Sequence, residues 1–594
     1  MKLILEKNMK TMIKITRNKV ALGALVALLG LTSCQDYLDI EPKDKLNSDQ
    51  VYRDIFDADA AVVGIYGKFM GLAKKYVVLN ELRADLMSLT ANADMYLQQI
   101  NEHAVTKDNP YANPKDFYEV INNCNDALKN FKIMAEENKM DQGEFNERYS
   151  DIGTLRSWLY LQLGIHYGEV PYVTEPIANI DDVQNENLYP RLSLTALINE
   201  LVDFTESLPY TSPYSANSTL VINVDGYNTA KFFINKECLL GDLNLWANNY
   251  MQAAAHYKTV METASNSGSD SERYDVYRVK WAEIASNNDL AVGYIRYREQ
   301  DARALVNNNT QGWRSMFARE KDVLWNTEWI WSLPFDSNFA PQNPFVELFS
   351  NQGGDYLVKP SQEAMDLWDN QAQRNGFSYD ARGSKFSYNI INGQPVIMKY
   401  LFKYLDSDTQ LPIDVFQTGG DWFLYRAATL HLRYAEAANR DNQHKIADAL
   451  LNFGIQNAYT VNGITDVTNI EQTHQPSPYD FDARQGDFPF FRGNWYRNTG
   501  IRGRAYVERA EVMGDSLISI ENNLIKESAL ELAYEGNRWG DLLRVALRRN
   551  DPAFLADKVY NKLDKDGNPN AGGVRSKLMS TSNWYLPFVW NKEE

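Results

Sequence analysis

Aromatic rings that stand beside hydrogen-bonding side chains are the residues of this sequence best suited to bind a ligand. A flat ring can stack on the C–H face of a pyranose while Asn, Asp and Arg side chains bind the sugar hydroxyls, so that weak contacts add up over several sugar units. This pattern predicts a surface for oligosaccharides and requires no catalytic group. The candidate ligand-binding residues are Arg83, Asp85 and Tyr96 in the loop joining early helices, and Tyr294, Arg296, Trp313 and Arg314 around a run of asparagines.

The same rings also suit a protein interior, and aromatic residues make up 12% of the 594-residue chain. For every candidate, a core position fits the sequence at least as well as a ligand-binding one. Trp329 and Trp331 are a clearer case, because residues two apart in an alternating segment share one face of a strand. We therefore expect both of these tryptophans in the core.

Catalytic and metal-binding signatures are missing from the sequence. The histidines, at 103, 166, 256, 431, 444 and 474, include no pair at metal-ligand spacing. There is neither a nucleophile elbow nor a phosphate-binding loop. Two carboxylates can still meet in the fold, as in glycosidases, but no local pattern selects a pair. We expect no enzyme activity, no cofactor and no metal site.

Two acidic segments near the C-terminus fit structural roles. The segment 564–568 begins like a calcium loop, but its glycine comes two positions too early and no Glu completes it, so we expect a tight turn. Glu535 and Asp541 flank Arg538 at helical spacing. We expect an ion pair there that stabilises the C-terminal helices.

Cys34 follows a Leu-Thr-Ser tripeptide that closes the apolar run 20–31 after a basic start. Such a start is typical of a secretory signal, and a cysteine directly after the cut is typical of bacterial lipoproteins, in which the thiol and the new amino group are acylated. Several acyl chains hold a protein durably at a bilayer. We predict a signal peptide over 1–33 and a lipid anchor on Cys34. A plain secretory signal or a first helix of the fold are the alternatives, and Met9 or Met12 are alternative starts of translation.

The net charge and the number of cysteines limit which partners and which disulfides we expect. The net charge is -18 at pH 7, so the chain repels phosphate backbones and we expect no nucleic acid partner. Once Cys34 carries lipid, only Cys124 and Cys238 remain, too few for a disulfide framework. No segment after the signal approaches the length of a membrane-spanning apolar helix.

Hydrophobic periodicity predicts a mainly α-helical body behind a polar tether over 34–48. We expect one body over 49–594, with an N-terminal helical part over 49–264, an irregular part over 265–425 and a C-terminal helical and loop part over 426–594. A few short strands are expected, at 328–333 and 396–400. Long irregular connections in a compact body are usually functional, so we expect the middle part to face the ligand.

Residues 229–264 have the pattern of a helix pair, broken near residue 248. Gly241, Ala253 and Tyr257 occupy the small and apolar positions of a tetratricopeptide unit, where small residues let two antiparallel helices approach closely. The match is partial, because Glu237 and Asn244 stand where aromatic residues are usual.

A series of motifs resembles, in order, the SusD-like (SusD/RagB) family of outer-membrane nutrient-binding lipoproteins. They are LRSWLY at 155–160 with GEVPYVTEP at 168–176, RLS at 191–193 leading to LP at 208–209, NTEWIW at 326–331, DAR at 380–382, the segment 425–439, ELAYEGNRWGDL at 531–542 and NWYLP at 583–587. The resemblance covers nearly the whole chain. It implies a mostly helical body with four tetratricopeptide-like units, on which the irregular segments build a ligand surface. The sequence at 425–428 departs from the family's Arg-x-Ala-Asp, and the insert near 486–504 is a second departure.

The resemblance also implies a function and a partner. It implies a lipid-anchored, surface-exposed outer-membrane protein that captures oligosaccharides without catalysis and delivers them to a SusC-like, TonB-dependent barrel transporter. One alternative is that the same architecture binds peptides, as the RagB side of the family suggests, with backbone hydrogen bonds more important than exposed rings. A secreted hydrolase is the other alternative, and it needs two convergent carboxylates in a cleft.

Overall fold

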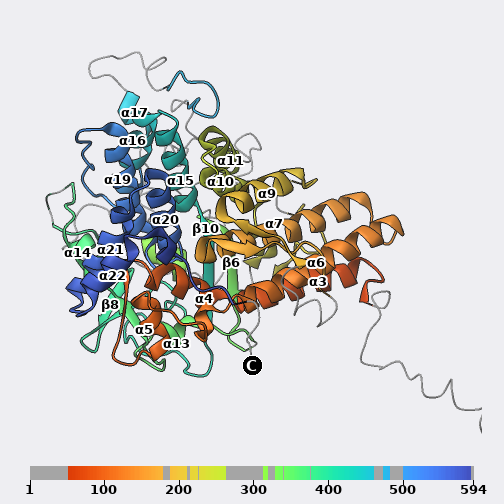
Figure 1. Cartoon of the computed structure of the whole chain (residues 1–594), viewed down its shortest axis with the longest axis horizontal. Helices are drawn as coiled ribbons and strands as arrows, with labels where there is room; N and C mark the ends of the chain where they lie inside the picture. Colours follow the sequence, from red (N-terminus) through yellow and green to blue (C-terminus); the bar gives the residue numbers. More distant parts are fainter. Residues whose placement is uncertain are drawn as a thin grey trace, which may run out of the picture. The chain divides into compact units, whose positions relative to one another are not determined.

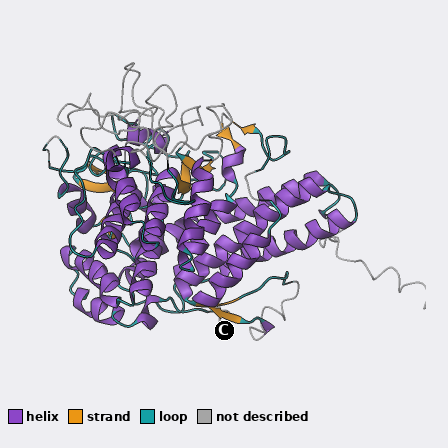
Figure 2. Cartoon of the chain, turned by 90° about the horizontal axis from the view of Figure 1, so that it is seen from above, coloured by secondary structure: helices purple, strands orange, loops and turns teal. Residues whose placement is uncertain are grey.

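The computed structural model describes residues 51–177, 188–210, 214–224, 227–262, 312–318, 328–338, 340–374, 376, 378–459, 472–481 and 500–589. By its internal contacts the chain divides into two compact units, Met1–Asp57 and Ala58–Glu594. The second unit contains nearly all the described residues. It is built mainly of helices with a few short strands, as the sequence predicts (Figure 1 and Figure 2).

The N-terminal part of the second unit is helical, and most of its longest helix, α7, is buried. Asp141 and Glu144 form a capping box at the start of α7, which is buried along nearly its whole length from Arg148 onward. Helices α6 and α9 pack on α7, and α10 packs on α9 and α11. The helices of this part are α3 (Ile55–Met70), α4 (Ala73–Val77), the π-helix η1 (Val78–Leu82), α5 (Met95–Asn101), η2 (Pro110–Ala112), α6 (Lys115–Glu136), α7 (Gln142–Tyr167), α9 (Leu194–Ser207), η4 (Thr229–Phe232), α10 (Lys236–Trp246) and α11 (Tyr250–Glu262).

Helices α10 and α11 confirm the predicted helix pair. A Cβ atom on Gly241 would lie 2.3 Å from a ring carbon of Tyr257, so only glycine lets the two helices approach this closely. The Tyr257 hydroxyl then reaches across the pair and donates a hydrogen bond to Asp242 Oδ1 at 2.7 Å. The chain reverses at Asn248, whose φ of 64° is left-handed.

The middle part supplies short helices and half of the strands that the structure describes. Each sheet among the described residues is a two-stranded antiparallel ribbon, with the pairs β1–β7, β2–β3, β4–β5, β6–β10 and β8–β9. The strands are β1 (Met87–Leu89), β2 (Glu169–Pro171), β3 (Arg191–Ser193), β4 (Asn223–Val224), β5 (Tyr227–Asn228), β6 (Trp329–Phe335), β7 (Val358–Pro360), β8 (Tyr388–Ile391), β9 (Gln394–Ile397) and β10 (Gly420–Arg426), and the helices are α12 (Gly312–Ala318), α13 (Phe345–Phe349) and α14 (Gln362–Asp369). The strand predicted at 328–333 is present as β6, whereas the one predicted at 396–400 overlaps β9 only at residues 396 and 397, because the chain turns after Ile397.

The β6–β10 ribbon packs its aromatic side chains on helices of the N-terminal part. The ring of Phe69 on α3 stacks on Trp331 at 5.5 Å and on Trp422 at 4.8 Å, while Trp158 of α7 meets Phe69 edge-on at 5.3 Å. Trp329 and Trp331 are 2% and 0% exposed, which confirms their predicted core position. Large rings buried against each other in this way are a major source of core stability.

The C-terminal part is helical, with α15 in contact with α11, α16 and α19. The segment 564–568 forms the predicted turn after α21, where Gly567 has a φ of 74° and Asp566 accepts hydrogen bonds from Ser88 Oγ and the Gln362 amide. The elements are α15 (Ala427–Arg440), α16 (His444–Asn452), α17 (Ile455–Tyr459), α18 (Ile501–Arg504), α19 (Ser516–Leu532), α20 (Arg538–Arg549), α21 (Pro552–Lys565), α22 (Ala571–Leu578) and η5 (Thr581–Trp584).

The predicted ion pairing around Arg538 is structural but has other partners. Helix α20 begins at Arg538, so Glu535 lies outside the helix and bonds Arg426 instead. Arg538 pairs with Asp85, and Asp541 pairs with Arg544 one helical turn later. The prediction assumed that Glu535, Arg538 and Asp541 share one helix. It is wrong because α20 starts three residues after Glu535.

Three absences apply to the described residues alone. None of their helices is long and apolar enough to cross a membrane. Within the same residues, no group of three or more His, Cys, Asp and Glu side chains is placed to hold a metal ion. Cys124 and Cys238 are both buried free thiols.

Candidate functional site

Arg83, Asp85 and Tyr96 do not form the predicted loop surface. Arg83 and Asp85 are each 1% exposed, and Tyr96 is half-buried within helix α5. Asp85 makes a bidentate ion pair with Arg538 at 2.6 and 2.7 Å, which ties the segment after η1 to helix α20. Arg83 and Asp85 thus lie in the turn after η1 but are buried, and the structure corrects the loop position of Tyr96 alone, which lies in a helix; contact of the three residues with a ligand stays a prediction.

Trp313 and Arg314 lie side by side in sequence on helix α12 but have different surroundings. Trp313 is 1% exposed, and its ring lies 5.1 Å from Lys399 Nζ and 5.4 Å from Arg426 Cζ. Arg314 is half-buried, with its Cζ 5.0 Å from the centre of the Phe402 ring. The expected exposed stacking ring is thus corrected to a ring that packs on buried cations. Arg314 is the member of the pair that reaches the surface.

The remaining predicted site residues cannot be placed. Tyr294 and Arg296 lie outside the described residues, and so does the predicted lipidation site Cys34. Their roles therefore stay predictions.

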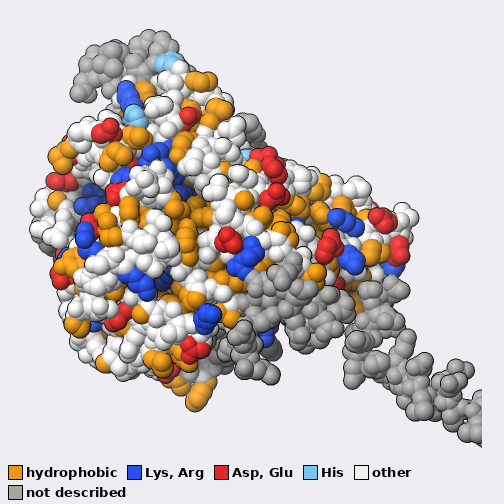
Figure 3. Space-filling view, viewed as in Figure 1, with side chains coloured by type: hydrophobic (Ala, Val, Ile, Leu, Met, Phe, Trp, Pro, Cys, Tyr) orange, Lys and Arg blue, Asp and Glu red, His pale blue; other side chains and the backbone are white. Residues whose placement is uncertain are grey.

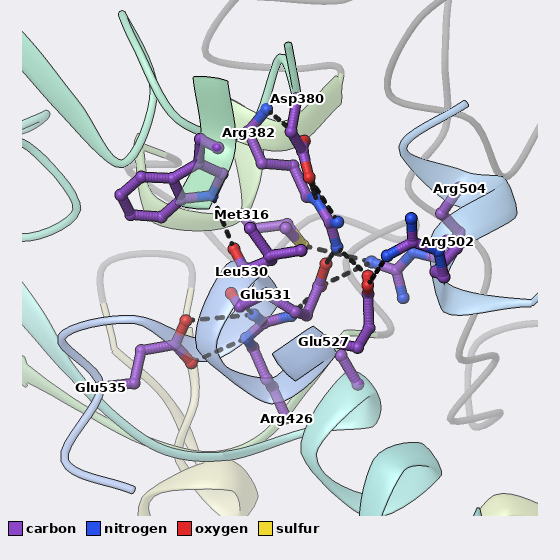
Figure 4. A network of polar contacts seen from close by, with 12 residues as sticks. Met316, Asp380, Arg382, Arg426, Arg502, Arg504, Glu527, Leu530, Glu531 and Glu535 are labelled. Carbon is purple, nitrogen blue, oxygen red and sulfur yellow. Dashed lines mark hydrogen bonds and ion pairs between the residues drawn. The ribbon is translucent and has the colours of Figure 1, made fainter. Parts of the chain in front are cut away.

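Close to Trp313 lies a buried network of ion pairs that joins the residue before β6, the end of β10, the turn at 380–382 and helices α18 and α19 (Figure 4). Arg426 is its centre, with Glu328 at 2.8 Å, Glu531 at 2.9 Å and Glu535 at 2.8 Å. The other members are Asp380, Arg382, Lys399, Arg502, Arg504 and Glu527. Acidic and basic members are equal in number, so the network is close to neutral. Buried charges need such partners because desolvation is costly.

Burial and charge shift the pKa values inside this network in opposite directions. For Glu531, burial opposes ionisation, but the guanidiniums around it lower its pKa to about 2. For Glu328, burial prevails over the attraction of Arg426 and raises the pKa to about 7. Glu328 is only 2% exposed and bonds Arg426 and Arg504. Its raised pKa therefore follows from its place in a buried network of ion pairs.

The surface beside Arg314 combines a cation with carboxylates. Burial lowers the pKa of the Arg314 guanidinium, and the nearby charges of Asp408 and Asp406 act in the opposite direction. Asp408 is exposed and Asp406 is half-buried, where it accepts hydrogen bonds from the amide and hydroxyl of Thr409. These three side chains, which we call the α12 surface, offer donors and acceptors to a polar ligand.

An apolar patch follows the α12 surface along the chain. Leu411, Ile413, Val415 and Phe416 are 53%, 67%, 51% and 84% exposed, and Ile390 on the β8–β9 hairpin is 52% exposed. The neighbouring Asn389 and Gln410 side chains bond each other at 3.4 Å, so the hairpin and this loop are adjacent. Apolar side chains also interrupt the charged surface elsewhere (Figure 3). Exposed apolar groups that gather in one place mark interaction surfaces.

A pocket of about 320 Å³ lies beside helix α6. Its volume is near the lower end of the range for small-molecule sites. Much of its polar surface is already bonded within the protein: the Tyr118 hydroxyl donates to the Pro171 carbonyl, and the Asn122 side-chain oxygen accepts from the Ile177 amide. The lining residues are Lys68, Pro114, Lys115, Tyr118, Glu119, Asn122, Asn123, Ile177 and Val589. Because these groups are committed to the fold, we rank this pocket below the α12 surface for a sugar.

Comparisons with known proteins agree with the fold. Residues 256–589, more than half of the chain, match the model of the SusD family, and the chain belongs to that family. The solved structure of a SusD superfamily protein from Bacteroides vulgatus covers 90% of this chain and 96% of its own, at 13% identity and a TM-score of 0.55. A SusD superfamily protein from Bacteroides thetaiotaomicron covers 90% and 95%, at 17% identity and a TM-score of 0.52.

A third similar structure is that of a protein named for the class of ligand that it binds. This SusD-like carbohydrate binding protein from Bacteroides fragilis covers 85% of this chain and 88% of its own, at 15% identity and a TM-score of 0.52. At such identities the likeness establishes the fold alone. A search of curated proteins found no match to this sequence.

Proposed function

We propose that this chain binds oligosaccharides without cleaving them and delivers them to a SusC-like, TonB-dependent barrel transporter. The observation that supports the proposal most is the shared fold, over 85% of the chain, with a SusD-like carbohydrate binding protein. Membership of the SusD family makes a binding role more plausible than a catalytic one. The raised carboxyl pKa of Glu328 does not oppose this reading, because that side chain is closed off from solvent.

The α12 surface is the place where we expect the ligand to bind. Arg314, Asp406 and Asp408 supply donors and acceptors there, and the buried Trp313 ring holds α12 on the ion network beneath it. Tyr294 and Arg296 remain proposed members of this surface. Binding residues carried by loops on a rigid scaffold are common, and the buried network provides that rigidity.

The anchor and the partner complete the proposal. Lipid on Cys34 would hold the protein at the outer membrane with its body outside the cell. The exposed patch of Leu411, Ile413, Val415 and Phe416 is an apolar surface that a transporter of this kind could cover. Replacing Phe416 by Ser should then weaken co-purification with the barrel in mild detergent while leaving sugar affinity unchanged. Equal recovery of the barrel with the variant would contradict this docking surface.

Calorimetry of the mature chain with pooled glycans and, separately, pooled peptides tests the ligand class. Heat of binding with glycans alone supports the proposal, and heat with peptides alone would establish the alternative in which the same fold binds peptides. Analysis of the glycan pool after incubation tests for hydrolysis. Shortened products would overturn the claim that binding occurs without catalysis.

A matched pair of variants tests the location of the site. Arg314→Ala removes a half-buried cation from the α12 surface, whereas Asn122→Ala removes a carboxamide from the α6 pocket. We expect the first change to weaken glycan binding about tenfold, the worth of one charge-assisted hydrogen bond, and the second to leave it unchanged. The reverse result would move the site to the α6 pocket.

A further inference from the structure

A second, smaller pocket lies far along the sequence from the α12 residues, where the segment after α5 meets the C-terminal turn. It has a volume of about 90 Å³. One water needs roughly 10–15 Å³ by this measure, so the pocket has room for a larger polar group. Its lining includes Arg83, His103, Lys577, Ser582, Asn583 and Tyr585, and none of the described residues that line it is acidic.

Arg83 is a buried guanidinium without a carboxylate partner among the described residues. One of its terminal nitrogens lies 3.2 Å from His166 Nδ1, and the other donates to the Trp584 carbonyl. Its Cζ lies 4.0 Å from the centre of the Trp539 ring, and its Nε has no hydrogen-bond partner in the part of the chain that the structure describes. An uncompensated buried charge is costly, so an anion nearby would stabilise this arrangement.

Two lysines near His103 add to the positive charge. Lys577 Nζ donates to the His103 carbonyl at 2.6 Å, and Lys562 Nζ donates to the Leu82 carbonyl and to Asn101 Oδ1, each at 2.8 Å. Neither lysine has a carboxylate within ion-pair distance in the described part of the chain. Burial, followed by the charges of Arg83, Lys562 and Lys577, lowers the pKa of His103 well below its usual value. His103 is therefore neutral and adds no charge of its own.

Hydroxyl donors complete the pocket. The Tyr585 hydroxyl forms no hydrogen bond with any described residue, and Ser582 Oγ bonds only the neighbouring Ser580 Oγ, at 3.0 Å. Lys577 is exposed, so the pocket is open to solvent on that side. Among the described residues no carboxylate lies within ion-pair distance of Arg83, Lys562 or Lys577, which is notable in a chain of net charge -18, where acidic residues outnumber basic ones.

We propose that this pocket binds a small tetrahedral oxyanion, sulfate or phosphate, either as the free ion or as a substituent on a sugar. Lys577 and Arg83 would supply the charge, and Tyr585 and Ser582 would donate hydrogen bonds to its oxygens. Several donors that converge on one anion are the usual means of oxyanion recognition. The proposal rests on these residues and is independent of glycan binding at the α12 surface.

Calorimetry tests the pocket directly. Sodium sulfate and sodium phosphate are titrated into the mature chain at constant ionic strength, with sodium chloride as the blank. Glucosamine 6-sulfate and glucosamine are titrated in parallel. We expect one anion bound per chain. Tighter binding of the sulfated sugar than of free sulfate assigns the anion to a glycan substituent, and weaker or equal binding assigns it to the free ion; both results support the site.

Variants at the rim separate this pocket from general surface charge. Lys577→Met should weaken the anion about tenfold, the worth of one charge-assisted hydrogen bond, and Tyr585→Phe should weaken it by a smaller factor. Lys129→Met is the control, because it removes an exposed lysine of α6 and leaves the pocket intact. Circular dichroism verifies that each variant is folded. No binding beyond the chloride blank, or equal affinity of the Lys577 and Lys129 variants, would overturn the proposal.

Discussion

Replacing Arg426 by Met tests whether the buried ion network holds the middle part of the fold together. Arg426 is 1% exposed and bonds Glu328, Glu531 and Glu535. Methionine keeps much of the volume and removes the charge, so three buried carboxylates lose their shared partner. Breaking a buried pair in this way costs about 3–5 kcal/mol, because the remaining charge is left without compensation. We expect a fall of this size in the free energy of unfolding.

The matched control for this change is Arg575→Met. Arg575 pairs with Asp557 at 2.6 Å, but the two side chains are 42% and 49% exposed. Water screens such a pair, so its loss should cost at most about 1 kcal/mol. Urea unfolding at pH 7, followed by tryptophan fluorescence, measures both variants against the wild-type chain.

The pH dependence of the stability of the Arg426→Met variant gives a second test of the same prediction. Burial already raises the pKa of Glu328 to about 7, and the loss of Arg426 removes the main charge that lowers it. A carboxyl whose folded pKa lies above its unfolded value loses stability as pH rises between the two. The deficit of the variant should therefore be smaller at pH 5 than at pH 8. A loss below about 1 kcal/mol at both values, equal to that of the control, would refute the reasoning.

Other residues give predictions of their own. Gly241→Ala puts a methyl group 2.3 Å from the Tyr257 ring and should lower the melting temperature, whereas Gly64→Ala, with nothing within 4 Å of its Cβ, should not; equal melting temperatures would refute the close packing of α10 on α11. Burial raises the pKa of Asp151 to about 7, so its ionisation destabilises the fold as pH rises from 4 to 7, and Asp151→Asn should gain stability relative to wild type over that range. Urea unfolding across that range measures this, and a constant difference would contradict it. Cys34→Ala should leave the protein unprocessed or released from membranes, and a lipid adduct that persists in its mass spectrum would sink the anchor assignment.

Local patterns in the sequence predicted much of the fold. The helix pair at 229–264 could be predicted because Gly241 and Tyr257 occupy the small and apolar positions of a tetratricopeptide unit, and the structure places them side by side. Alternation in the segment that contains Trp329 and Trp331 likewise predicted a buried strand, now β6. Both patterns lie within one short stretch of the chain.

Contacts between residues far apart in the sequence could not be predicted from local patterns. Arg426 and Glu531 are 105 positions apart, and Arg83 and Trp584 are 501 apart, so no local spacing reveals these contacts. One signal was available: the motifs at 380–382, 425–439 and 531–542 contribute Arg382, Arg426 and Glu531 to the buried network. These motifs therefore encode the interior. The burial of Arg83 and Trp313 could not be predicted for the same reason, since residue type and spacing do not distinguish a buried cation or ring from an exposed one.

Native mass spectrometry of the mature chain, incubated with an equimolar mixture of oligosaccharides and peptides, tests the central claim most directly. The account predicts adducts with the masses of intact oligosaccharides, no peptide adducts, and an unchanged distribution of oligosaccharide lengths in the free pool. Adducts with peptides alone, or a pool that shortens with time, would contradict it.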